Sequence, residues 1–209
     1  MPFDPNKRQY RSFDSTFSVN AVTSDESKAY VVEGYATTFD APYELFKDYD
    51  GEPVYECIRS TALAGADMSD IIFQLNHEGA PLARLRNKSL SVESDEHGLR
   101  VRAKLDGSQE ARDLYEAIAN GLIDRMSWGF TIAPDGEEWD KETRTITISK
   151  VDKIFDVSAV SFPANDDTAI HSARSLLDGV IDRQGRGEFA ADARDRELRQ
   201  RAALKLRLL

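Results

Sequence analysis

Residues 120–132 read NGLIDRMSWGFTI, and the periodicity of the apolar side chains changes within this stretch. The segment that leads into it, residues 108–122, has apolar side chains at helical spacing. The segment that follows, MSWGFTIA at residues 126–133, is rich in aromatic and β-branched side chains and predicts a strand. Ser127 stands where the helix passes into the strand, so it is either a structural residue or a nucleophile.

The predicted helix over residues 108–122 carries its own start and stop signals. Ser108 is suited to the N-cap and Gly121 to the position after the last turn. The side chains expected on its buried face are Ala111, Leu114, Tyr115, Ile118 and Leu122.

On both sides of this centre the sequence predicts strands. Residues 15–22 and 30–37 flank a polar turn and predict a hairpin. A second, antiparallel hairpin is predicted over residues 88–105, because apolar and charged side chains alternate in its second half. Further strands are expected at 54–59, 70–77, 144–150 and 153–162, whereas 39–54, dense in Asp, Pro and Gly, predicts a loop. The fold class is therefore α+β, mostly antiparallel β with one or two helices packed on it.

Composition excludes several classes of function. The formal net charge of −10 argues against a domain that binds nucleic acid by neutralising phosphates. Cys57 is the single cysteine, so neither an intrachain disulfide nor a CxxC metal site can form, and a reducing cytoplasm is expected. The N-terminus has no apolar signal-peptide core, and no apolar run approaches the ~18 residues of a membrane helix. We expect a soluble protein without cofactor, metal, membrane or nucleic-acid partner.

The chain divides into three predicted regions. Residues 1–8 are expected to be a flexible arm, residues 9–173 the main domain, and residues 174–209 a charged helical tail. The tail carries nine Lys and Arg against six Asp and Glu, or +3, so the remainder carries −10 − 3 = −13. The tail is therefore a separate electrostatic unit.

Three histidines are the candidate bases for a serine nucleophile. A serine hydroxyl needs such a base, and neutral imidazole is the usual one. His97 lies in a predicted hairpin turn and His171 near the start of the tail, where solvent exposure explains each. His77 follows the apolar run IIFQL, where a rigid strand reaches the surface. His77 is therefore the histidine to pair with Ser127.

A third group must orient the histidine, and Asp156 is the best placed by pattern. It lies in KIFDVSAVSF, residues 153–162, between Phe155 and Val157 in a strand otherwise built for burial. A buried charge there is costly unless it is paired. The alternative is that strict alternation sends Asp156 to solvent. The short motifs of other hydrolases do not decide the matter, because Arg125 takes the first glycine position of GxSxG.

Taken in order, five segments resemble the prohead proteases of tailed bacteriophages. They are EGYAT, LNHEG, LSVESDEHGLRVRAKL, NGLIDRMSWGF and FDVSAVSFPANDDTAI, and the likeness covers roughly residues 25 to 173. The resemblance implies a β-barrel surrounded by helices, similar to herpesvirus assemblin, and a serine endopeptidase activity that matures the capsid. It implies that Ser127 is the nucleophile, His77 the general base and Asp156 the orienting group. By analogy with the assemblin loop, Ala164 and Asn165 would supply the oxyanion donors, although a plain turn remains the alternative.

The resemblance also implies partners and a place of action. The substrates would be the major capsid protein or its scaffolding segment and the protease itself, inside the assembling procapsid in the host cytoplasm. A homo-oligomer is expected, because assemblin-like enzymes favour dimers. The resemblance further implies that the tail is a segment for docking to the assembly or for self-processing; the alternative is a solvated helix that caps the core. Two alternatives stay open: a non-catalytic assembly module of the same fold, with His77 and Ser127 apart or unaligned, and a small-molecule hydrolase with a deep apolar pocket.

Overall fold

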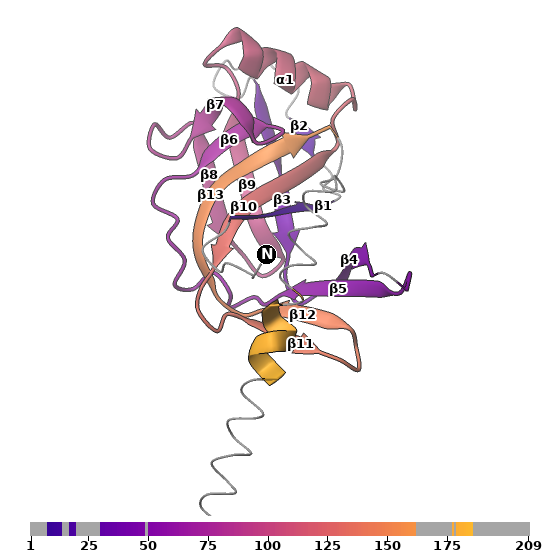
Figure 1. Cartoon of the computed structure of the whole chain (residues 1–209). Coiled ribbons are helices and arrows are strands. Elements are labelled where there is room, and N and C mark those ends of the chain that lie inside the picture. The colour runs from indigo at the N-terminus through magenta and orange to yellow at the C-terminus, as the bar shows by residue number, and fades with distance from the viewer. Residues whose placement is uncertain are drawn as a thin grey trace, which may run out of the picture.

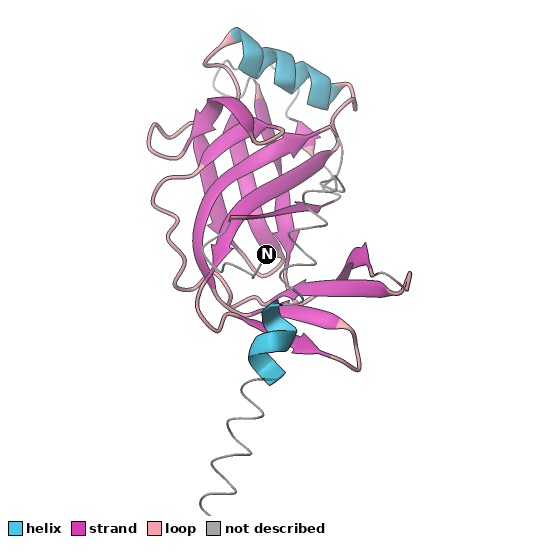
Figure 2. Cartoon of the chain, in the orientation of Figure 1, coloured by secondary structure: helices cyan, strands magenta, loops and turns pink. Residues whose placement is uncertain are grey.

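A computed structural model describes residues 8–13, 17–19, 30–48, 50–161, 177 and 179–185. Within these ranges the chain is mostly strand with two helices, which confirms the α+β class (Figures 1 and 2). The strands are β1 (Gln9–Phe13), β2 (Ser18–Val19), β3 (Val31–Thr38), β4 (Tyr43–Lys47), β5 (Pro53–Ile58), β6 (Ile72–Leu75), β7 (Glu78–Arg84), β8 (Leu90–Ser94), β9 (Gly98–Lys104), β10 (Arg125–Ile132), β11 (Glu137–Asp140), β12 (Thr145–Ile148) and β13 (Val151–Val160). The helices are α1 (Gln109–Ala119) and a short one over 177–185.

Hydrogen bonding divides these strands among three sheets. The largest has the order β1-β10-β13-β6-β7, the second β11-β12-β5-β4 and the third β2-β3-β9-β8. Most neighbours are antiparallel, as expected, but β13 pairs with β6 and β12 with β5 in parallel. In Figure 1 the first and third sheets face each other below α1, and the second lies at the lower end beside the short helix.

The expected closed β-barrel is not formed by the described strands. The first and third sheets meet through contacts of β3 with β10 and β1, without a hydrogen-bonded ladder to close the ring. The second sheet is separated from the first by a turn between β12 and β13. The carbonyl of Gly136 accepts the backbone N–H groups of both Ser149 (2.7 Å) and Lys150 (3.2 Å), and the chain turns there. As a result β12 belongs to the second sheet and β13 to the first.

Helix α1 begins and ends as the sequence indicates. The Ser108 hydroxyl accepts the Ala111 N–H at 3.1 Å, and Gly121 follows the helix with a φ of +71°. Four of the five predicted face residues are buried: Ala111, Leu114, Tyr115 and Ile118. The fifth prediction is wrong, because the helix ends at Ala119 and leaves Leu122 75% exposed beyond it.

The central strands supply the core and set the direction of every site residue. In β10, Met126, Trp128 and Phe130 are fully buried and form one face of the strand, with the rings of Trp128 and Phe130 stacked at 4.0 Å. Phe73 of β6 and Val157 of β13 are also fully buried in this core. Because side chains alternate along a strand, Ser127 and Gly129 lie on the opposite face of the sheet.

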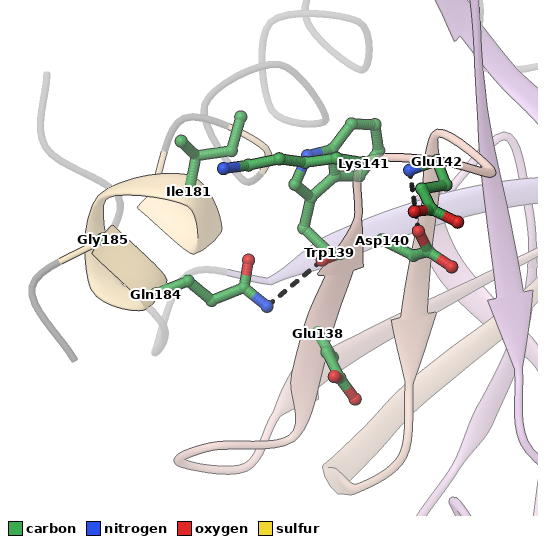
Figure 3. A pocket seen from close by; sticks show the side chains of 8 residues that line it. All are labelled: Glu138, Trp139, Asp140, Lys141, Glu142, Ile181, Gln184 and Gly185. Carbon is green, nitrogen blue, oxygen red and sulfur yellow. Dashed lines mark hydrogen bonds between the residues drawn. The ribbon is translucent and has the colours of Figure 1, made fainter. Parts of the chain in front are cut away.

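The short helix at 177–185 packs against the second sheet. The Gln184 side chain donates to the Trp139 carbonyl at 3.2 Å, and Arg183 forms an ion pair with Glu137. Figure 3 shows a groove between this helix and β11, about 570 Å³ in volume, lined mainly by polar and charged side chains. It contains none of the three predicted triad residues. No helix in the described ranges is both long and apolar enough to span a membrane.

Candidate active site

Strand β10 holds Ser127 between two neighbours. Ser127 is opposite Ser158 of β13 on one side and Ser12 of β1 on the other, and it is fully buried. Both flanking residues, Met126 and Trp128, are buried in the core. The position of the Ser127 hydroxyl is therefore set by the packing of the strand.

His77 lies in the two-residue turn between β6 and β7. Leu75 and Glu78 are paired, and the two residues between them, Asn76 and His77, have φ values of 52° and 60°. Left-handed conformations at both central positions are typical of a type I′ hairpin turn, which matches the twist of the flanking strands. The Asn76 side chain accepts the Ser161 N–H at 3.0 Å and so ties the turn to the end of β13. The turn directs the imidazole toward β13 and β10.

Asp156 lies in β13, between the serine strand and the strand that leads to His77. It is opposite Gly129 of β10 and opposite Ile72 of β6. Phe155 has no partner in the ladder, since the register shifts from Asp156↔Gly129 to Ile154↔Phe130, which is a β-bulge. The bulge interrupts the alternation just before Asp156. The alternative that Asp156 faces solvent is therefore wrong, because its side chain is 1% exposed.

The three predicted residues form one continuous chain of hydrogen bonds. The Ser127 Oγ lies 2.7 Å from His77 Nε2, and His77 Nδ1 contacts Asp156 Oδ1. With the proton on Nδ1 donated to the carboxylate, Nε2 accepts the serine hydroxyl. The non-catalytic alternative expected His77 and Ser127 to be apart or unaligned, whereas Ser127 Oγ lies within hydrogen-bond distance of His77 Nε2.

Asp156 has partners that the sequence analysis missed. The Ser158 hydroxyl donates to Oδ1 at 3.1 Å, and Arg8 Nη1 lies 3.4 Å from Oδ2. The Tyr10 ring lies against His77, with centroids 4.5 Å apart. Ser158 could have been predicted as a neighbour of Asp156, because residues two positions apart in a strand lie on the same face. Nothing in the segment that contains Arg8 and Tyr10 indicated that it would lie beside β10.

Gly129 provides the room in which these groups meet. A Cβ added there would lie 2.5 Å from Asp156 Oδ2 and 3.0 Å from the Tyr10 ring. A glycine near Ser127 suggests close approach of a substrate to the backbone, but the neighbours observed here, Tyr10 and Asp156, come from the strands on both sides of β10.

The remaining candidates are not part of this cluster. His97 is exposed in the turn between β8 and β9, as predicted. His171, Ala164 and Asn165 lie outside the described residues. Within the described part of the chain, no group of three or more His, Cys, Asp and Glu side chains is arranged to hold a metal ion.

A second polar cluster lies on the other face of β1. Arg11 Nε donates to both carboxylate oxygens of Glu56, at 2.8 and 3.0 Å, and the Tyr43 hydroxyl donates to the same carboxylate. Burial opposes the charge on Arg11, yet the Glu56 carboxylate holds the Arg11 pKa above its ordinary value. Burial and the same carboxylate raise the pKa of Tyr43 well above its ordinary range. The cluster joins β1 to β5 and β4.

A serine hydroxyl hydrogen-bonded to an imidazole, whose other nitrogen contacts a buried carboxylate, is the arrangement typical of serine hydrolases. Comparison with known families narrows this class. The model of the caudovirus prohead serine protease family matches residues 15–180. The chain belongs to this family, and it is a serine protease.

Two curated relatives agree with this assignment. The prohead protease of Enterobacteria phage HK97 is 30% identical over 170 residues, which cover 81% of this chain and 69% of that protein. The prohead protease of Escherichia phage T5 is 25% identical over 161 residues, covering 76% and 70% of the two chains. No solved structure matches the chain significantly.

Proposed function

We propose that this protein is the endopeptidase that matures a phage procapsid, with Ser127 as nucleophile, His77 as general base and Asp156 as orienting group. The observation that carries the proposal is the 2.7 Å contact between Ser127 Oγ and His77 Nε2, with His77 Nδ1 on the buried Asp156. The family model and the relatives named prohead protease support the choice of substrate class.

The proposed reaction follows from this geometry. His77 Nε2 takes the Ser127 proton as Oγ attacks the scissile carbonyl, and the imidazolium then gives that proton to the leaving amine. The acyl-enzyme is hydrolysed by a water whose proton passes to the same nitrogen. Asp156 holds the Nδ1–H tautomer and stabilises the imidazolium. The developing oxyanion requires preorganised N–H donors, and we assign these to Ala164 and Asn165 by analogy.

The proposed substrates are the scaffolding segment of the major capsid protein and the protease itself. Cleavage would take place within the assembling procapsid in the host cytoplasm, with the protease as a homo-oligomer. We also propose that the first and third sheets, which face each other, are arranged as in the assemblin fold. The tail from residue 174 would dock to scaffold or shell. Its short helix packs on the chain's own β11 through Glu137 and Trp139, which is also the packing expected of a helix that caps the core.

The test is co-expression of the wild type and variants with their capsid protein and scaffold, with products followed by intact mass. We expect wild type to trim the scaffold and itself. Ser127→Ala and His77→Ala should each lower the cleavage rate by about a millionfold, because the members of a triad act as a unit. His97→Ala is the matched control, since this exposed imidazole is remote from the cluster, and it should cleave at the wild-type rate. Equal processing by wild type and Ser127→Ala would overturn the proposal.

A further inference from the structure

Strand β1 lies outside the segment that the family model matches, yet it contacts the site. The family model begins at residue 15, whereas β1 spans Gln9–Phe13 and is preceded by Arg8. β1 pairs with β10 along its whole length, from Gln9↔Phe130 to Phe13↔Met126. This register aligns Tyr10 with Gly129 and Ser12 with Ser127. The first strand of the chain therefore runs beside the nucleophile.

The two faces of β1 have different tasks. Arg8 and Tyr10 lie on the face that carries Ser127, and Arg11 lies on the opposite face, as the alternation of a strand requires. On the first face, Arg8 Nη1 lies 3.4 Å from Asp156 Oδ2 and 3.4 Å from the Tyr10 hydroxyl. The guanidinium also lies 4.0 Å above the Phe155 ring, at the bulge.

Together these contacts surround the polar side of the triad. Asp156 Oδ1 is occupied by His77 and Ser158, and Arg8 is the cation next to Oδ2. The Tyr10 ring, tilted by 58° and 4.5 Å away, restricts the rotation of the His77 imidazole. Gly129 has no side chain to separate β1 from Asp156.

The opposite face fixes β1 in place. Arg11 is 3% exposed and forms a two-point contact with Glu56, which is fully buried. Removing one partner of a buried ion pair is strongly destabilising, because the other charge stays buried. The pair thus anchors β1 to the second sheet independently of its ladder to β10. A strand held in this way keeps Arg8 and Tyr10 next to the site.

We propose that β1 completes the active site: Arg8 is a positioning residue for Asp156, Tyr10 is a positioning residue for His77, and the Arg11–Glu56 pair holds both in register. This inference rests on the proposed triad. It assigns part of the catalytic geometry to residues that precede the family-matched segment.

The test measures the reactivity of Ser127 directly in the full-length protein, with a fluorophosphonate probe. In this reaction Ser127 Oγ forms a bond to phosphorus, fluoride leaves, and His77 takes the hydroxyl proton. Because the probe is small, the labelling rate reports the triad without a contribution from capsid-protein binding. Arg8→Met keeps an alkyl chain over Phe155 and removes the charge. Arg8→Lys restores the charge but not the planar group that stacks over Phe155, so it separates the effect of the charge from that of the stacking.

We expect Arg8→Met to label roughly fivefold more slowly than wild type, since the guanidinium is partly solvated. Arg8→Lys should label faster than Arg8→Met, because it keeps the charge beside Asp156. Tyr10→Ala should be roughly tenfold slower, and Tyr10→Phe close to wild type. The melting temperature should stay unchanged in both Arg8 variants. Arg59→Met is the matched control, because Arg59 pairs with Asp40 at 3.2 Å on the exposed surface, and it should label like wild type.

The outcomes separate the two proposals. If Arg8→Met labels at the wild-type rate, or if Arg8→Lys is as slow as Arg8→Met, the positioning role of Arg8 is wrong. If wild type and Ser127→Ala label equally, the triad itself is wrong, and the proposed function fails with it. In capsid-protein cleavage, Arg8→Met should lower kcat and leave KM unchanged; a rise in KM alone would contradict a role through Asp156.

Discussion

At the scale of single residues, the site depends on one missing side chain. Gly129 faces Asp156 from the neighbouring strand, and a Cβ there would stand 2.5 Å from Oδ2. The carboxylate would have to move, and with it the imidazole that it orients. A displacement of about 1 Å at a catalytic group can cost about a hundredfold in rate.

We therefore expect Gly129→Ala to lower kcat about a hundredfold, with the fold retained. Gly107→Ala is the control, because a Cβ at Gly107 meets nothing within 4 Å. Fluorophosphonate labelling and circular dichroism on the two variants test this expectation. Wild-type labelling of Gly129→Ala would mean that Asp156 moves without consequence for Ser127.

The three residues proposed for the triad could be selected from the sequence as candidates, but their supporting contacts could not. Ser127, His77 and Asp156 each stand at a strand end or in an apolar strand, and the family resemblance selected them together. Arg8 reaches Asp156 across 148 positions of sequence, through a strand pairing that no local pattern encodes. The bulge at Phe155 is a shift in the pairing of β13 with β10. Such a shift depends on both strands together, so neither segment alone predicts it.

At the scale of elements, position in the sheet explains in part which strands were missed. The missed strands are β1, β4, β7 and β11, and each is at an edge of its sheet, although the other two edge strands, β2 and β8, were predicted. An edge strand packs on fewer neighbours, so its sequence need not show apolar alternation, and β7 even contains Gly79 and Pro81. The central strands β10 and β13 are buried on at least one face, and their many apolar side chains make them recognisable in the sequence.

The turn that carries His77 is an element whose strain can be measured. Asn76 adopts a φ of 52° and its side chain also bonds to Ser161. Asn76→Ala and Asn76→Gly both lose the side-chain bonds, but only glycine adopts this conformation freely. Asn76→Ala should therefore be about 1 kcal/mol less stable than Asn76→Gly. Urea unfolding of both variants gives the difference; equal midpoints would show that the turn relaxes.

The Arg11–Glu56 pair makes a prediction about how β1 is held. Arg11→Met leaves Glu56 charged and buried, and we expect it to lower the free energy of unfolding by about 3 kcal/mol. Arg11→Met combined with Glu56→Met removes both charges and should recover most of that loss. Denaturant unfolding of the two variants and wild type provides the cycle. A double variant that is less stable than the single one would show that the ion pair itself stabilises the strand.

At the scale of the whole molecule, surface carboxylates with lowered pKa values contribute to the response to acid. Hydrogen bonds from Lys153 and Ser69 lower the pKa of Asp67, and a hydrogen bond from Arg84 lowers the pKa of Asp70. A hydrogen bond from the backbone N–H of Gly98 is the largest cause of the lowered pKa of Asp95, and one from the backbone N–H of Glu142 is the largest cause of the lowered pKa of Asp140. These four carboxylates belong to turns or termini of different strands, so their effect is spread over the fold.

The sign of the effect follows from proton linkage. A lowered pKa in the folded state means that the unfolded chain binds more protons between the folded value and the ordinary value of 3.8. The stabilisation is complete above the ordinary value and is lost as the pH falls through the lowered ones. We expect the urea midpoint to be steady from about pH 6 to 5 and to fall steeply below about pH 4. Replacing all four residues by Asn should flatten this fall; a slope as steep as that of the wild type would assign acid unfolding to other groups.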